Sequence, residues 1–276
     1  MPLDEYRRKR DFSQTPEPSG KTPTRARRPG QPESLYFCVQ KHLASRLHYD
    51  LRLEHNGVLL SWAVPKGPSL DHRDKHMAVQ TEDHPYDYGD FEGVIPEGYG
   101  AGIVMLWDHG TWQPEVDDID AALRKGDLKF TLDGYKLKGS WVLVRTRDRP
   151  DTAPSQRGRS WLLIKHRDFW SGPIDMTTFA PLSVKSEGDF DDILSADMPD
   201  LWVTGRPSTS RGGATGKMLQ EIIQKAAVKI VEREEAHAIT ATGTKAGAAR
   251  TQSRAASKRP ASRRAGPTKT PTRRNS

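Results

Sequence analysis

Short apolar or alternating runs, separated by turn residues, follow one another along the chain from Leu35 to His166. Such runs are typical of β-strands, in which successive side chains face opposite sides. Asn56-Gly57 lies between two of them, and this dipeptide favours a tight hairpin, so 48–54 and 58–64 are expected to pair antiparallel. Strands are predicted at 35–40, 48–54, 58–64, 76–82, 103–108, 110–116, 127–132, 135–146 and 160–166, with one short helix at 119–125.

The close spacing of these strands predicts a mainly β protein, a single compact antiparallel β-barrel with short helices. A β-sandwich is the alternative. We expect the barrel domain to span 35–205. After it, apolar residues recur with helical spacing, which predicts a helix at 217–236. These residues are Leu219, Ile222, Ile223, Ala226 and Ile230.

The two ends of the chain have a different composition from the middle. Residues 1–34 form a polar arm rich in Pro, Arg and Ser, and every Trp, Tyr and Phe lies at or before Trp202. Residues 206–276 carry 16 Lys and Arg against 4 Asp and Glu, which accounts for the net charge of +7. We expect this basic tail to be largely disordered and to bind phosphate backbones without reading sequence. The alternative is that it only keeps the protein soluble.

Composition excludes several classes of protein. The single cysteine, Cys38, excludes a disulfide framework and a Cys-rich zinc site and suits a reducing compartment. No apolar run approaches the roughly 20 residues of a membrane span, and no apolar segment follows the N-terminal MPLDEYRRKR. We therefore expect a cytoplasmic, nucleoid-associated monomer with no membrane partner.

Candidate chemistry is concentrated between Lys41 and Glu54. On a strand His48, Asp50 and Arg52 share one face. His42, six residues before His48, could join them from the preceding loop. Two imidazoles and a carboxylate suit Mn, Fe or Zn better than Mg or Ca, and the planar fork of an arginine suits phosphate. The alternative is an ordinary solvated strand face.

A second polar cluster, Glu82, His84 and Tyr88, follows a later strand, and His84 is a candidate acid, base or phosphate donor. Its alternative is a surface loop. Lys66 is either a turn lysine or a further phosphate cation. The glycines of EGVIPEGYGAG lack a following Gly-Lys-Ser/Thr, so a nucleotide P-loop is rejected.

Two competing functions belong to other classes. The two-histidine, one-carboxylate triad of non-haem Fe(II) oxygenases is also matched in residue type by His48, Asp50 and the distal His84. A non-enzymatic DNA-binding protein, with the barrel as scaffold and the basic tail as the active part, is the other alternative.

Several strings together resemble one family. RDFSQTPEP, KHLASRLHYDLRLEHNG, LLSWAVPKGPS and AVQTEDHPYDYGDFEGVIPEG are similar to the 3′-phosphoesterase domain found in bacterial DNA ligase D and as free-standing proteins. The resemblance covers roughly residues 5–170. It implies a β-barrel whose groove holds Mn²⁺, or another divalent transition metal, and which removes a terminal ribonucleoside and then the 3′-phosphate from primer ends. The implied setting is DNA repair by non-homologous end joining, on primer-template DNA or DNA/RNA, with a separate ligase as partner.

The resemblance also implies a role for each matching residue. The implied metal ligands are His42, His48 and Asp50; Arg52, Lys66 and His84 surround the phosphate, with Tyr88 and Glu82 in support; and Arg10, Asp11 and Glu17 bring the arm over the groove. His84 is expected to protonate the leaving oxygen. Two departures stand out, since His76 replaces the family's usual arginine and the IPEGYG segment is one residue short.

Overall fold

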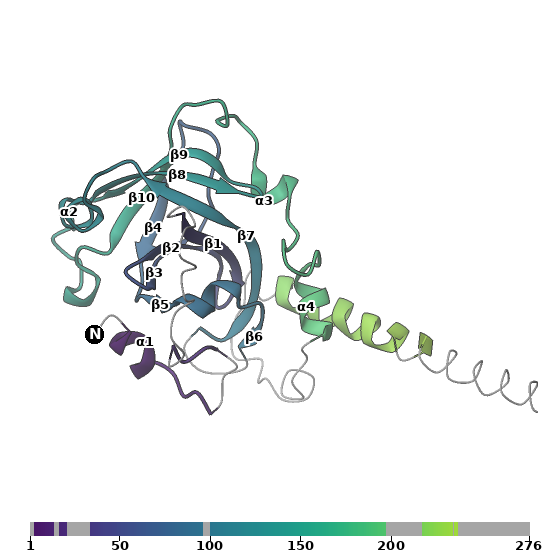
Figure 1. The fold of residues 1–276 in the computed structure, drawn as a ribbon. Helices are drawn as coiled ribbons and strands as arrows, with labels where there is room; N and C mark the ends of the chain where they lie inside the picture. Colours follow the sequence, from purple (N-terminus) through teal and green to yellow (C-terminus); the bar gives the residue numbers. More distant parts are fainter. Residues whose placement is uncertain are drawn as a thin grey trace, which may run out of the picture. The chain divides into compact units, whose positions relative to one another are not determined.

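The computed structural model describes residues 3–13, 17–20, 34–95, 100–196, 217–233 and 235–236. Its strands are β1 (Leu35–Leu43), β2 (Leu47–His55), β3 (Val58–Val64), β4 (His76–Gln80), β5 (His84–Pro85), β6 (Gly93–Ile95), β7 (Gly102–Pro114), β8 (Asp127–Gly134), β9 (Lys138–Arg145) and β10 (Ser160–Lys165). Its named helices are α1 (Asp4–Arg8), η1 (Tyr86–Asp90), α2 (Ile119–Lys125), η2 (Pro154–Gln156), α3 (Met176–Phe179) and α4 (Phe190–Ala196) (Figure 1).

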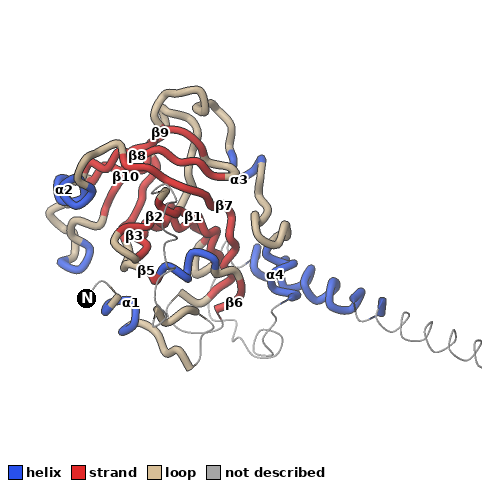
Figure 2. The backbone as a smooth tube through the Cα atoms, in the orientation of Figure 1, coloured by secondary structure: helices blue, strands red, loops and turns tan. Residues whose placement is uncertain are grey.

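The long strands close into an antiparallel barrel. Their order is β1-β2-β3-β4-β10-β9-β8-β7, and β7 pairs with β1 to complete the ring (Figure 2). The short strands β5 and β6 lie outside the ring, on β3 and β7 respectively. The predicted mainly β fold with a single antiparallel barrel is thus confirmed.

The β2–β3 hairpin forms where the Asn-Gly pair predicts it. Asn56 and Gly57 both have positive φ, 49° and 80°, as the favoured two-residue hairpin turn requires. His55 then faces Val58, and this register continues to Tyr49 opposite Val64. The register sets which residues of β2 face the core and which face outward.

Two strand predictions were wrong. The segments 103–108 and 110–116 form the single strand β7, because Gly110 allows close approach to β8 and does not make a turn. A Cβ at this position would overlap the main-chain oxygen of Asp133. The strand predicted from 135 begins only at Lys138, since the Asp108 carboxylate accepts the backbone N–H groups of Lys136 and Leu137 and holds a turn there.

The barrel interior is filled by large apolar side chains. Five tryptophans are almost fully buried: Trp62, Trp107, Trp112, Trp141 and Trp161. Along β2 the core receives Tyr49, Leu51 and Leu53, so the intervening residues face outward. This alternation leaves the outer face of β1–β3 for polar chemistry.

A helix at 217–233 coincides with the apolar spacing found after residue 205. Ile222 and Ala226 join the same buried cluster as Phe190 of α4, and Lys229 pairs with Asp191 at 2.8 Å. Contacts divide the chain into two units, 1–229 and 230–276, so this stretch of the helix belongs with the barrel. Residues 237–276, where we predict disorder, lie outside the described part.

None of the helices that the structure describes is both long enough and apolar enough to cross a bilayer.

Candidate functional site

Three potential metal ligands meet on the outer face of β1 and β2. His42 lies opposite His48 in the strand register, and Asp50 follows two residues later on the same face. The His42 Nδ1 atom is 3.8 Å from Asp50 Oδ2, and His48 Nε2 is 3.6 Å from Asp50 Oδ1. All three ligand atoms lie within 4.8 Å of one another. The structure thus brings together the three residues for which metal binding was predicted.

Backbone carbonyls fix the orientation of both imidazoles. His42 Nε2 lies 2.9 Å from the carbonyl oxygen of Gly100, and His48 Nδ1 lies 2.9 Å from that of Arg46. A carbonyl oxygen only accepts, so these two ring nitrogens carry the hydrogens. The opposite ring nitrogens face Asp50, and a ring fixed by an outer partner in this way is typical of metal-binding histidines.

Asp50 remains charged despite its burial. Burial alone would raise its pKa, but the Arg52 guanidinium, followed by His48 and His42, holds the pKa of Asp50 well below its usual range. Two imidazole nitrogens and one carboxylate form a donor set that suits a divalent transition metal. The residues present therefore fit such an ion.

Arg52 is held on several sides. Its Nε donates to Gln40 Oε1 at 2.7 Å, Nη1 to Ser61 Oγ at 2.8 Å, and Nη2 to Asp50 Oδ2 at 3.1 Å. The guanidinium also lies 4.8 Å from the ring centre of Tyr88. This side chain is rigidly positioned, and its remaining N–H groups are available to an anion.

Gln40 and Ser61 are site residues that the sequence analysis missed. Gln40 is fully buried and donates from Nε2 to the carbonyl oxygens of Tyr88 and Phe91, at 2.9 and 2.8 Å. It therefore connects Arg52 to the η1 segment. Its position two residues before His42 on an alternating strand is the signal that places it on the same outer face.

His84 is present in a defined tautomer. Its Nδ1 lies 2.9 Å from the carbonyl oxygen of Glu82 and so carries the hydrogen, while Nε2 lies 3.4 Å from Arg10 Nη2 and accepts. Burial, Arg52 and Arg10 together lower the pKa of His84 well below its usual value. The ring is thus neutral, with its lone pair directed toward Arg10.

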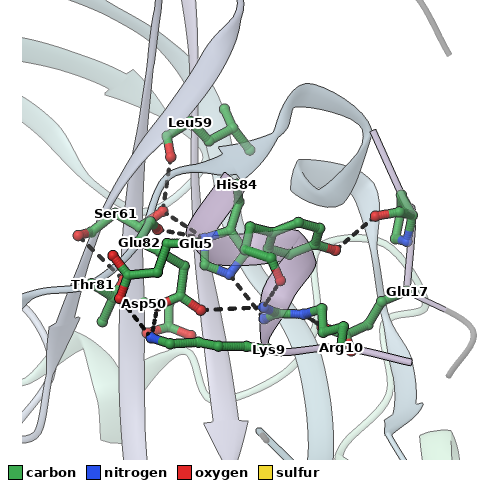
Figure 3. Close-up of polar contacts among 12 residues, drawn as sticks. Glu5, Lys9, Arg10, Glu17, Asp50, Leu59, Ser61, Thr81, Glu82 and His84 are labelled. Atoms are coloured by element: carbon green, nitrogen blue, oxygen red, sulfur yellow. Dashed lines mark hydrogen bonds and ion pairs between the residues drawn. The ribbon is translucent and has the colours of Figure 1, made fainter. Parts of the chain in front are cut away.

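The N-terminal arm reaches the site through Arg10. Its guanidinium bonds to Glu17 at 2.8 Å and to Glu82 at 3.2 Å, and it lies 3.9 Å from the Tyr6 ring centre (Figure 3). Lys9 adds a 3.0 Å ion pair to Glu82, which lowers the pKa of that carboxyl against the effect of burial. Within residues 3–13 and 17–20 of the arm, Arg10 and Glu17 line the same cleft as His84.

Many of these side chains line one open cleft of about 420 Å³, which we call the polar cleft. It is lined by Arg10, Glu17, His42, Ala44, Ser45, His48, Asp50, Arg52, Ala63, Thr81, Glu82, His84, Tyr88, Gly100 and Ala101. His84 stands apart from the three-residue ligand group, so the oxygenase triad proposed with His84 does not assemble among the described residues.

Three predicted residues lie elsewhere. Lys66 and His76 line a separate pocket of about 320 Å³, and His76 Nδ1 donates to the carbonyl oxygen of Gly67 at 2.6 Å. Asp11 is exposed and accepts from the hydroxyl and backbone N–H of Ser13. The shortened IPEGYG segment includes residues 96–99, which lie outside the described part.

Comparison with known proteins gives a consistent match. Residues 40–145 match the family model described as the DNA Ligase D 3′-phosphoesterase domain. The chain is 56% identical over 168 residues to the multifunctional non-homologous end joining protein LigD of Pseudomonas aeruginosa, covering 60% of this chain and 19% of that protein. It is 46% identical over 145 residues to the LigD DNA repair protein of Mycobacterium tuberculosis, covering 52% and 18%.

The matched stretch contains the ligand group, Arg52 and His84. The chain spans about a fifth of the length of the curated relatives it matches. Taken with the barrel and the polar cleft, the comparisons show that residues 40–145 belong to the DNA ligase D 3′-phosphoesterase domain family.

Proposed function

We propose that the protein is a metal-dependent phosphoesterase that processes the 3′ ends of primer strands in DNA repair. The observation that carries the proposal is the orientation of His42 and His48, each of which contacts a backbone carbonyl with one ring nitrogen and turns the other toward the Asp50 carboxylate. Two imidazoles and a carboxylate arranged in this way suit a divalent transition metal. The proposed ion is Mn²⁺, held by these three residues.

The remaining residues of the polar cleft suit an anionic substrate. A bound divalent ion would supply Lewis-acid stabilisation of a phosphoryl oxygen and would lower the pKa of a water. Arg52 supplies fixed N–H donors beside it, because Gln40 and Ser61 hold its guanidinium in place. Preorganised donors of this kind stabilise the charge that develops during phosphoryl transfer. Lys66 and His76 are proposed to contact more distant phosphates of the substrate.

His84 takes a different part from the one expected from sequence. Its ring is neutral, its Nε2 accepts from Arg10, and its lowered pKa makes it a weak base, so it is poorly placed to protonate the leaving oxygen. We propose that His84 instead holds the Arg10 guanidinium in place beside the substrate phosphate. Tyr88 and Glu82 support it, Tyr88 by ring contact at 4.8 Å and Glu82 through its carbonyl oxygen.

The proposed substrates are primer-template ends that carry a terminal ribonucleotide or a 3′-phosphate. The names of the relatives place those proteins in non-homologous end joining, and we extend that setting to this chain. We propose two successive reactions, removal of the terminal ribonucleoside and then of the exposed 3′-phosphate. We also propose that a separate ligase is its partner and that the protein is a cytoplasmic, nucleoid-associated monomer.

A labelled primer ending in one ribonucleotide tests the proposal. With Mn²⁺, the primer should shorten first to a 3′-phosphate product and then to a 3′-hydroxyl product, which gel electrophoresis resolves. His84→Gln should bind the same primer-template but shorten it far more slowly. Binding without shortening by the wild-type protein, at any added divalent ion, would instead favour the non-enzymatic DNA-binding protein.

A further inference from the structure

The connection between β9 and β10 is rich in arginine. It carries Arg147, Arg149 and Arg157, and all three side chains are exposed. In the part of the chain that the structure describes, their guanidinium groups form no ion pair. We call these three residues the arginine hairpin.

Three charged neighbours of the arginine hairpin, Arg145, Asp148 and Arg159, are already engaged. Arg145 lies over the Trp161 ring at 5.4 Å, and Arg159 donates to both carboxylate oxygens of Glu5 at 3.3 Å. Asp148 accepts the backbone N–H of Gly158 at 2.9 Å, which shapes the turn. Among the described residues, no ion pair therefore uses the positive charge that the arginine hairpin presents.

A chain of ion pairs connects this hairpin to the polar cleft. Arg159, at its base, pairs with Glu5 of α1; Glu5 pairs with Lys9 at 2.9 Å; and Lys9 pairs with Glu82 at 3.0 Å. In Figure 1 the connection between β9 and β10 lies beside α1. Helix α1 adds a further exposed cation, Arg8.

We propose that the arginine hairpin, with Arg8, binds the sugar-phosphate backbone of the duplex that leads to the 3′ end in the polar cleft. This inference rests on the proposed function. Arginine side chains that lie on an irregular connection, without a groove or a fixed fork, suit a repeating anion better than a defined sequence. The contact positions the substrate and takes no part in the chemistry.

Binding to an unmodified duplex in the presence of a chelator tests the inference without turnover. Three variants are compared with the wild type across a salt series. The first replaces all three hairpin arginines by Gln, the second replaces them by Lys, and the third is a charge-matched control. The control carries Lys75→Gln, Lys129→Gln and Arg167→Gln, three exposed cations outside the arginine hairpin and both pockets.

Each phosphate contact contributes roughly 0.9 to the slope of log affinity against log salt. The Gln variant should therefore lose roughly 2 to 3 from this slope, while the Lys variant and the control each lose less than about 1. On a cleavable primer-template, the Gln variant should raise KM and leave kcat near the wild-type value.

Equal slopes for the Gln variant and the charge-matched control would overturn the inference, since the loss would then follow net charge and not this surface. An unchanged slope in the Gln variant would overturn it as well. The exposed arginines would then suit an acidic protein partner and not DNA. Because binding is measured without metal, absence of turnover would count against the proposed function and not against the arginine hairpin.

Discussion

At the scale of single residues, the main feature is that main-chain carbonyls decide which nitrogen of each histidine faces the site. Gly100 and Arg46 fix His42 and His48, and the carbonyl of Glu82 fixes His84. The second ring nitrogens of His42 and His48 face Asp50, and that of His84 faces Arg10. The same residue type is thereby turned toward a carboxylate in two places and toward a guanidinium in a third.

The metal ligands give the first prediction. Asp50→Asn and His48→Ala should each weaken Mn²⁺ binding by more than the roughly 10- to 100-fold that loss of an outer-shell partner costs. The measurement is the free Mn²⁺ signal in electron paramagnetic resonance as protein is added. His55→Ala is a control, since His55 pairs with Asp120 on the exposed surface. Wild-type affinity in the Asp50→Asn variant would contradict the assignment.

Arg52 gives the second prediction. Arg52→Lys should lose most of the turnover although the charge is kept, because one ammonium group cannot satisfy Gln40, Ser61 and Asp50 together. Each buried polar atom left without a partner costs about 1–3 kcal/mol, so the melting temperature should also fall. Steady-state kinetics and thermal melting measure the two effects. A variant with unchanged kcat and melting temperature would contradict a role for the Arg52 fork in the site.

Asp83 gives a prediction about pH. Burial raises its pKa to about 6, with His55 opposing and the nearby Glu5 and Glu82 adding to the rise. The pKa of Asp83 is near 3.9 in the unfolded chain and about 6 in the folded protein, so between these pH values the folded state binds more protons than the unfolded state. The stabilisation that comes from protonated Asp83 is therefore lost as the pH rises through this window.

Asp83→Asn should therefore melt above the wild type at pH 7 and converge with it near pH 4. Asp87→Asn, which removes an exposed carboxylate from the same stretch, is the matched control. A constant difference between Asp83→Asn and the wild type across this range would contradict the shifted pKa.

At the scale of elements, the helix over 217–229 changes how the C-terminal region is understood. Ile222 and Ala226 of this helix contribute to the buried cluster that contains the barrel core. Ile222→Ala should therefore destabilise the protein by about 2–5 kcal/mol. Gln224→Ala, on the exposed side of the same helix, should leave the melting temperature close to the wild-type value. Equal melting of both variants and the wild type would show that the helix does not support the barrel.

Element prediction succeeded where local pattern decides the structure and failed where distant contacts do. The Asn56-Gly57 turn and the helix at Ile119–Lys125 follow from local chemistry, since Asp118 caps the helix start and Gly126 ends it with φ 82°. Strand β7 was divided in two because Gly110 resembles a turn signal in sequence, whereas the neighbouring β8 requires the missing side chain.

At the scale of the whole molecule, the outer face of the barrel and the N-terminal arm together make the polar cleft. Alternation along β2 was enough to predict that His48, Asp50 and Arg52 share a face. Gln40 and Ser61 could not be recognised in the same way, because their importance lies in holding Arg52 and that contact exists only after β1, β2 and β3 pair. The contact of Arg10 with His84 likewise depends on where the arm folds.

Phosphate release from a 3′-phosphate primer-template, by chelator-stripped protein as Mn²⁺ is added, tests the metal centre most directly. We expect background release without metal, recovery of turnover with Mn²⁺ in the wild type, and background release at every Mn²⁺ concentration in Asp50→Asn. Full turnover by the stripped wild-type protein, or Mn²⁺-dependent turnover in Asp50→Asn equal to that of the wild type, would contradict a metal centre formed by His42, His48 and Asp50.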